Sequence, residues 1–432
     1  MKGRLNLFQA SMLRWRELYP YSAVHVVRIA DSLDVARLQR AIDDQLAGSG
    51  LTGLDLDVER RRYEYKGGAA RASLSILPAE SDPSQTLTRE IERQLNEPFA
   101  SDGRIDPFRF FALDRGQGFD LGLAYDHFVA AGDSIALLLK AIADRYRPDT
   151  AVPVARRGPD LYPPTYRRLF LRKPVAALAG MRRMPAIATS FRRAFRPRYP
   201  RGRDPYNGFA HFRVDRSGFA AMRSAAKAWG VTLNDLLLSM LLLALVRMTE
   251  DRRGQRRRNE LAVASIVNIR RDCGADASHA FGQFLSSFLV SHPVPSGVTL
   301  EQLTRDVHAE TARIKRERLY LQTLVVMSVS GILWRFLSPA RRARFHDKAY
   351  PVWAGLTPVN VDALWEQAGA PAPPPAYVRG VSTGPLTPLV VAATTAAGML
   401  AIGLTFRTAA FTREEIDKIA ASLLANVESL GR

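Results

Sequence analysis

The spacing of apolar residues divides the chain into two stretches in which strands and helices alternate. In the first stretch, the alternating run 21–29 predicts a strand, and apolar positions at helical spacing over 35–46 predict the helix that follows. The runs 108–113 and 119–125 predict two more strands, joined by a short polar turn that contains glycine. This stretch therefore predicts a sheet with helices packed against it.

The second stretch repeats this mixture. The nearly all-apolar run 261–269 predicts a central strand, and the run 281–292 predicts another. The segments 389–394 and 399–407 flank an Ala-Ala-Gly turn and predict a hairpin. The most apolar segment, at 233–246, is shorter than a membrane span and begins with polar residues, so it predicts a buried helix. Together the two stretches predict an α/β fold with mixed sheets in two related lobes.

Between the two stretches the composition changes to a segment rich in proline and arginine. We therefore divide the chain into an N-terminal lobe over 1–150, a linker over 151–205 and a C-terminal lobe over 206–432. Within the linker, residues 166–203 combine many Arg and Lys with apolar residues at helical spacing and with no acidic residue. This pattern fits a solvated linker, and it equally fits short amphipathic helices that contact an anionic membrane surface.

Charge and cysteine content narrow the function classes. The formal net charge of +19 favours anionic partners, but nucleic acid is disfavoured because the chain shows no nucleic-acid-binding motif. The chain has a single cysteine, Cys273, so we expect no disulfide within it. No Cys/His cluster has the spacing of a zinc site, so we expect no metal site. The N-terminus has no apolar core of a secretory signal, so we expect a cytoplasmic protein that is at most peripheral at the inner membrane surface.

The segment 121–140 contains the strongest candidate chemistry. An apolar strand ends at Asp126 and His127, a turn of small residues follows, and Asp133 and Ser134 open an apolar helix as its cap. A histidine at a strand end beside carboxylates is suited to act as a general base. The alternative is a core histidine whose ring is satisfied by a neighbouring backbone group.

This segment resembles the signature of a known enzyme group. The run DHFVAAGDS, which begins at Asp126, is similar to the His-His-x-x-x-Asp-Gly motif of the condensation-domain superfamily, which includes chloramphenicol acetyltransferase-like enzymes. It matches at His127, Gly132 and the following serine, Ser134. It departs at Asp126, where the family has its first histidine, and at Ala131, where the family has its aspartate.

Weaker similarities follow in the family's order and cover nearly the whole chain. They are LNEPFA at 95–100, GVTLNDLLLSMLLLAL at 230–245, VNIRRD at 267–272, FGQFLSSF at 281–288 and TPVNVD at 357–362. The resemblance implies two lobes that face each other across a tunnel, with His127 at the middle of that tunnel.

The resemblance also implies an activity. The expected reaction moves an acyl group from a coenzyme A or carrier-protein thioester to a hydroxyl or amine, of a lipid or a secondary metabolite. No bound cofactor is expected, since acyl-CoA or acyl-phosphopantetheine serves as co-substrate, and an acyl carrier protein is a candidate partner. Because two motif residues are replaced, a non-catalytic binding or scaffold protein with the same fold stays the alternative.

Within this scheme His127 takes the acceptor proton, and Asp133 or Asp126 orients the loop in place of the family's motif aspartate, which acts through an arginine. Asp133 as a helix N-cap is the simpler interpretation of that residue. Further candidates could contact substrate or co-substrate, although each also fits an ordinary turn, cap or strand-end role: Gly132, Ser134, Asn268, Arg270, Ser286 and Asn360.

Overall fold

A computed structural model describes most of the chain, namely residues 2–78, 80–147, 160–161, 169, 189–202, 204–273, 280–338, 341–342, 345, 350–367 and 374–431. Most of the linker predicted over 151–205 lies outside these residues, so its membrane contact and the location of the protein stay predictions. Within the described residues no single helix is long and apolar enough to span a membrane. One pair of helices meets that criterion jointly, but the pair is bent by 105°.

The first lobe is built on a five-stranded sheet in the order β15-β2-β8-β7-β5. All eight residues of its central strand, β8 (Phe119–Asp126), are buried, which explains the apolar run in the sequence. The other strands are β2 (Ser22–Ile29), β5 (Ser73–Ile76), β7 (Phe108–Asp114) and β15 (Tyr377–Val381), and the helices are α2 (Val35–Gly48), α3 (Pro83–Asn96) and α4 (Gly132–Tyr146). Helix α1 (Leu7–Arg16) and a small sheet of β1 (Lys2–Arg4), β4 (Arg62–Tyr65), β3 (Leu54–Asp57) and β6 (Gly103–Ile105) complete the lobe.

The second lobe is built on a six-stranded sheet whose order is β10 (Asn207–Val214), β17 (Met399–Arg407), β16 (Leu389–Ala396), β14 (Ala354–Asn360), β11 (Leu261–Asn268) and β13 (Leu285–His292). Its helices are α7 (Arg216–Ala228), α8 (Leu233–Val246), α10 (Leu300–Arg316), α11 (Gln322–Arg335), α13 (Val361–Gln367) and α14 (Arg413–Leu430). Most of α8 is buried, so the prediction of a buried helix there is confirmed. The β16–β17 hairpin is confirmed too, with Ala397 and Gly398 at positive φ in its turn.

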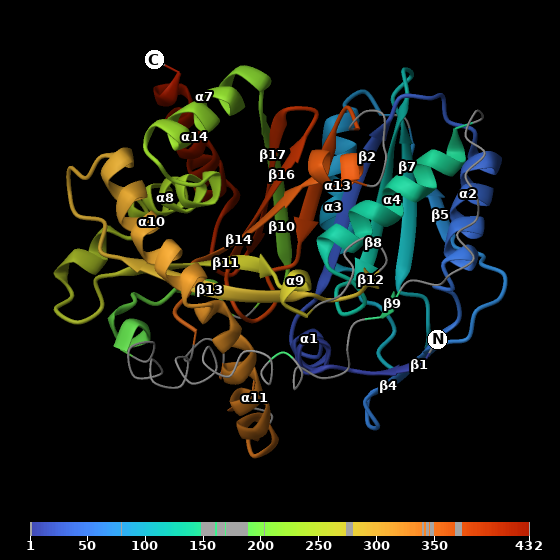
Figure 1. Cartoon of the computed structure of the whole chain (residues 1–432), viewed down its shortest axis with the longest axis horizontal. Coiled ribbons are helices and arrows are strands. Elements are labelled where there is room, and N and C mark those ends of the chain that lie inside the picture. Colours follow the sequence, from blue (N-terminus) through green and yellow to red (C-terminus); the bar gives the residue numbers. More distant parts are fainter. Residues whose placement is uncertain are drawn as a thin grey trace.

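The two large sheets lie next to each other, with α2 and α4 toward one side of the molecule and α8, α10 and α14 toward the other (Figure 1). One strand crosses between the halves of the sequence. Strand β15 pairs antiparallel with β2 of the first lobe, with Arg379 opposite His25. This strand was not predicted, because it is only five residues long and follows an Ala/Pro-rich segment. The crossover places residues of the C-terminal half beside the motif of the N-terminal lobe.

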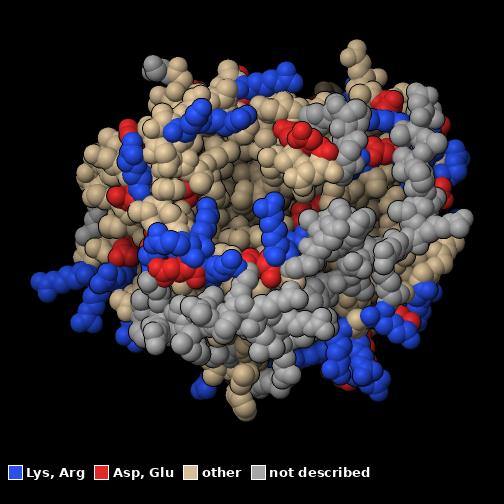
Figure 2. All heavy atoms as spheres, viewed as in Figure 1, with Lys and Arg blue, Asp and Glu red and all other residues tan. Residues whose placement is uncertain are grey.

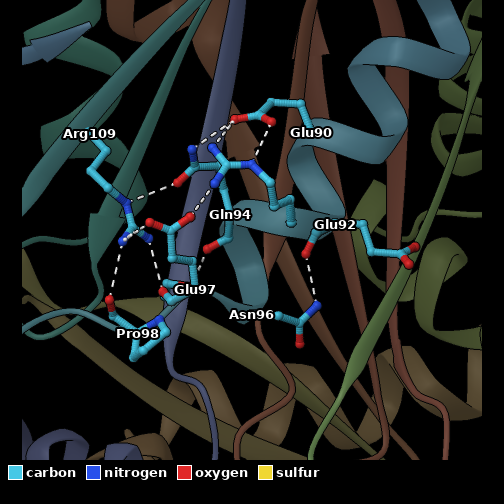
Figure 3. Close-up of polar contacts among 9 residues, drawn as sticks. Glu90, Glu92, Gln94, Asn96, Glu97, Pro98 and Arg109 are labelled. Atoms are coloured by element: carbon cyan, nitrogen blue, oxygen red, sulfur yellow. Dashed lines mark hydrogen bonds and ion pairs between the residues drawn. The ribbon is translucent and has the colours of Figure 1, made fainter. Parts of the chain in front are cut away.

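The C-terminal end of helix α3 forms hydrogen bonds with both lobes. Arg109 of β7 donates to the Gln94 side chain and to the carbonyls of Glu97 and Pro98, which holds that end of the helix (Figure 3). On the side toward the second lobe, the Asn96 side chain bonds the backbone of Asn207, the first residue of β10. Its Nδ2 donates to the Asn207 carbonyl and its Oδ1 accepts from the Asn207 amide, both at 2.8 Å.

We predict that Asn96→Ala lowers the free energy of unfolding by about 2–4 kcal/mol, because it leaves both backbone groups of the fully buried Asn207 without these partners. Urea unfolding measures the change. Asn426→Ala is the matched control, since Asn426 donates only to a carbonyl within its own helix. Equal losses in the two variants would contradict a role of Asn96 in joining the lobes.

Candidate active site

A cavity of about 200 Å³ lies where the lobes meet, and residues of both lobes line it. Its walls are mainly apolar, with side chains such as Phe8, Met12, Leu285 and Leu289. Among its polar lining groups is His127, the histidine of the motif. Binding sites are commonly concave, apolar and provided with a few convergent polar groups, and this cavity has those properties.

His127 reaches the cavity because β8 ends directly before it and α4 begins five residues later. Its backbone amide bonds the Tyr21 carbonyl, and its ring, only 7% exposed, stacks on the Tyr21 ring at 5.4 Å. Ring atom Nδ1 lies 3.3 Å from the Ala130 carbonyl oxygen, which can only accept. From that contact we assign the proton to Nδ1, which leaves the lone pair of Nε2 for chemistry; the Gln283 side-chain nitrogen also lies 3.3 Å from Nδ1, but its two hydrogens go to the carbonyls of His127 and Ala130.

Gln283 fixes the turn that holds this histidine. Its Nε2 donates to the carbonyls of His127 and Ala130, the latter at 2.5 Å, and it is fully buried. Gln283 lies in the loop before β13 of the second lobe, so the second lobe sets the orientation of the motif turn. No role was predicted for Gln283, whose only signal in the sequence is a lone amide between Gly282 and Phe284.

Burial lowers the pKa of His127 to about 4 from its ordinary value of 6.5. A general base works in its neutral form, which is populated above its pKa. We therefore predict that kcat/KM for acyl transfer is constant down to a pH of about 5 and falls only as the pH approaches about 4. The pH profile of the initial rate measures this limb.

The neighbouring carboxyl provides the control for that profile. Burial raises the pKa of Asp126 to about 6, against the opposing effect of Arg16, with which it forms an ion pair. Asp126→Asn should leave the acidic limb of the profile in place. A limb near 6 that disappears in Asp126→Asn would show that Asp126, and not His127, controls the rate.

Asp133 is not the helix N-cap that the sequence predicted. Helix α4 begins at Gly132 with Ala131 as its N-cap, and no side chain caps it. The carboxylate of Asp133 is instead drawn across to the second lobe, where Asn268 donates to it at 2.7 Å and Arg270 at 3.0 Å. One carboxylate oxygen, Oδ1, accepts from the Ser134 amide at 2.9 Å, while Oδ2 accepts from the buried arginine and the amide of the second lobe, because a charge-assisted pair is a strong interaction.

Arg270 contacts the first turn of helix α4, which follows the motif turn. It pairs with Asp133, donates to the Ser134 hydroxyl at 2.8 Å, and lies over the Phe284 ring. The family's motif aspartate acts through an arginine, and Ala131 cannot do so. Here Asp133 makes an arginine contact two residues later, and Asp126 makes another with Arg16 on the opposite side of the turn.

The structure brings only some of the other candidates to the cavity. Gly132, Asp133 and Asn268 line it, whereas Asp126, Ser134 and Arg270 do not. The substrate contacts of the lining residues stay predictions.

Ser286 and Asn360 do not point into the cavity. The Ser286 hydroxyl bonds the Tyr320 carbonyl, while its neighbour Ser287 lines the cavity, since successive side chains of a strand point to opposite faces. Asn360 is exposed at the end of β14, and its Oδ1 accepts from the Ala363 amide at the start of α13. Neither position supports the substrate contact that the sequence suggested.

Within the described residues no group of three or more His, Cys, Asp or Glu is arranged to hold a metal ion.

Arg379 of β15 lines the cavity beside Gly132 and was not predicted as a site residue. Its only signal was a single charged residue inside a short apolar strand, YVRGV.

Comparison with known proteins bears on the fold. No family model matches the chain, and no curated protein does. Among solved structures, the first condensation domain of the calcium-dependent antibiotic synthetase matches with a TM-score of 0.69 and 17% identity, over 100% of this chain and 96% of that one.

Two further structures agree. The EpoB NRPS cyclization-docking bidomain from Sorangium cellulosum has a TM-score of 0.69 and 15% identity, over 100% of this chain and 85% of that one. The SgcC5 protein from Streptomyces globisporus has a TM-score of 0.68 and 14% identity, over 99% and 98%. The chain therefore has the two-lobed α/β fold of condensation domains, as the sequence resemblance implied.

Proposed function

We propose that the protein is a condensation-type acyltransferase that moves an acyl group from a thioester to a hydroxyl or amine, with His127 as general base. The observation that supports this most is the position of His127: it lines a mainly apolar cavity between the lobes, with Nδ1 held by the Ala130 carbonyl. The similar solved structures are named as condensation, cyclization and epimerization domains, which supports chemistry on acyl groups.

The proposed step needs only the histidine. Nε2 of neutral His127 accepts the proton of the acceptor as its oxygen or nitrogen attacks the thioester carbonyl carbon. The tetrahedral intermediate then collapses, the carbon–sulfur bond breaks, and the leaving sulfur takes the proton from the imidazolium. The products are the ester or amide and a free thiol.

The co-substrate is proposed to be acyl-CoA or an acyl-phosphopantetheine on a carrier protein, both of which bear phosphate. Lys and Arg side chains lie beside a central hollow lined mainly by uncharged residues, with Asp and Glu side chains among them, and further Lys and Arg lie along the edges of this face (Figure 2). The formal net charge of +19 attracts anionic ligands. A carrier protein is a candidate donor, since two of the similar structures are named as a domain of an antibiotic synthetase and an NRPS cyclization-docking bidomain.

One test separates the donors. Octanoyl-CoA and an octanoylated carrier protein are each offered with a panel of alcohols and amines, and release of free thiol is followed. Acceptor-dependent release from either donor supports the proposal and identifies the donor. Release from neither would favour the alternative, a binding or scaffold protein, for which the replaced motif residues Asp126 and Ala131 are the specific evidence.

A further inference from the structure

Arg379 is a buried cation whose surroundings use only part of its hydrogen-bonding capacity. Its side chain lies at the junction of the lobes and the residue is 1% exposed. Nε donates to the Thr394 hydroxyl at 2.8 Å, and Nη2 donates to the carbonyls of Thr357 and Ala393 at 2.5 and 3.0 Å. A guanidinium has five N–H groups, so these bonds leave the two on Nη1.

The remaining nitrogen, Nη1, is beside the motif turn. A Cβ atom on Gly132 would stand 3.1 Å from Nη1 and 3.4 Å from Cε1 of His25, so a side chain there would crowd the arginine. Arg379, Gly132 and His127 all line the same cavity. The glycine of the motif therefore keeps open the space in front of Nη1.

No carboxylate among the described residues is paired with Arg379. The Asp133 carboxylate influences the pKa of Arg379, but it is already bound by Arg270 and Asn268. The other groups around it are uncharged: burial lowers the pKa of His25 well below its ordinary value and raises that of Tyr377. Burial also lowers the pKa of Arg379 to about 10, so it stays positively charged at neutral pH.

A buried charge without a counter-ion is costly, and it is relieved when a ligand supplies the opposite charge. Guanidinium N–H groups match a carboxylate in geometry and charge, and the cavity around Nη1 is otherwise mainly apolar. We propose that Arg379 binds, through Nη1, a carboxylate carried by the substrate of this cavity. The substrate class is then an amphiphile with an apolar body and one carboxylate. The inference rests on the proposed function for treating the cavity as a substrate site.

Binding experiments test the proposal without turnover. Octanoate and its uncharged counterpart octanamide are titrated into the full chain by calorimetry at neutral pH. Octanoate should bind at least about tenfold more tightly, in keeping with a charge-assisted hydrogen bond in an apolar site. Equal affinities, or no measurable binding of octanoate, would overturn the proposal.

Variants assign the preference to this residue. Arg379→Gln should abolish the preference for octanoate. Gly132→Ala should reduce the preference for octanoate without removing any hydrogen-bond partner. If Arg379→Gln does not fold, the result with Gly132→Ala tests the assignment to Arg379. Arg252→Gln is the matched control, since Arg252 is equally buried but does not line the cavity, and it should keep the preference. A preference that survives in both Arg379→Gln and Gly132→Ala would refute the assignment.

His127→Ala separates this inference from the proposed function. The neutral His127 supplies no charge, so this variant should lose acyl transfer but keep the preference for octanoate. On an active protein, two substrate pairs then locate the carboxylate: adipoyl-CoA against hexanoyl-CoA as donor, and leucine against leucinamide as acceptor. The pair whose carboxylate preference is lost in Arg379→Gln identifies the source, and the absence of a carboxylate preference in both pairs would count against the subsite.

Discussion

His127→Ala is expected to lower kcat/KM for acyl transfer by about 10²–10⁴-fold, the range typical of removing a general base. The loss should fall on kcat, because His127 is proposed to act on the proton in the transition state and its ring is a small part of the cavity wall. The measurement is the initial rate of free-thiol release at saturating donor and acceptor.

A second histidine provides the control for that result. His211 lies on β10, does not line the cavity, and forms a stacked pair with Phe209. His211→Ala should therefore leave the rate within about twofold, since acceleration by proton transfer requires a group within reach of the substrate. A rate in His127→Ala that equals the unmodified protein's would remove His127 from the mechanism.

Asp133→Ala is expected to lower the free energy of unfolding by about 3–5 kcal/mol, because it breaks a buried ion pair and leaves Arg270 without that carboxylate. The side chains of Asp133 and Arg270 are 11% and 3% exposed, and the pair joins the two lobes. Asn268 loses its acceptor in the same change. Chemical denaturation followed by tryptophan fluorescence measures the loss.

Asp144→Ala is the matched control on the same helix. Asp144 pairs with Lys140 one turn away within the same helix, and the two side chains are 19% and 9% exposed, so a smaller loss of about 1.5–3 kcal/mol is expected. If Asp133→Ala proved no more harmful than Asp144→Ala, the pair across the lobes would not stabilise the fold as described.

The elements around the motif could be predicted because local signals agreed there. An apolar run, a turn of small residues and an amphipathic helix give β8, the turn and α4 directly from the sequence. The placement of His127 beside a cavity followed from the resemblance. Strand β15 could not be found in this way, because its partner β2 lies some 350 residues earlier and a short strand leaves little local pattern.

The roles of polar residues were harder to predict because they depend on contacts made across the lobes. The cap predicted for Asp133 assumed that only nearby backbone donors reach its carboxylate; the Ser134 amide does so, but Oδ2 pairs with Arg270, which is 137 residues away in sequence. Ser286 was misplaced because strand β13 is apolar on both faces, so the pattern FLSSFLV does not show which serine faces the cavity. Arg379 gave no motif at all.

The most direct test of the central claim is mass spectrometry of the acceptor after incubation with an acyl thioester. The claim predicts one acylated acceptor for each thiol released by the unmodified protein, and both products formed about 10²–10⁴-fold more slowly with His127→Ala. Thiol release without an acylated acceptor, or an acylated acceptor formed equally well by His127→Ala, would contradict it.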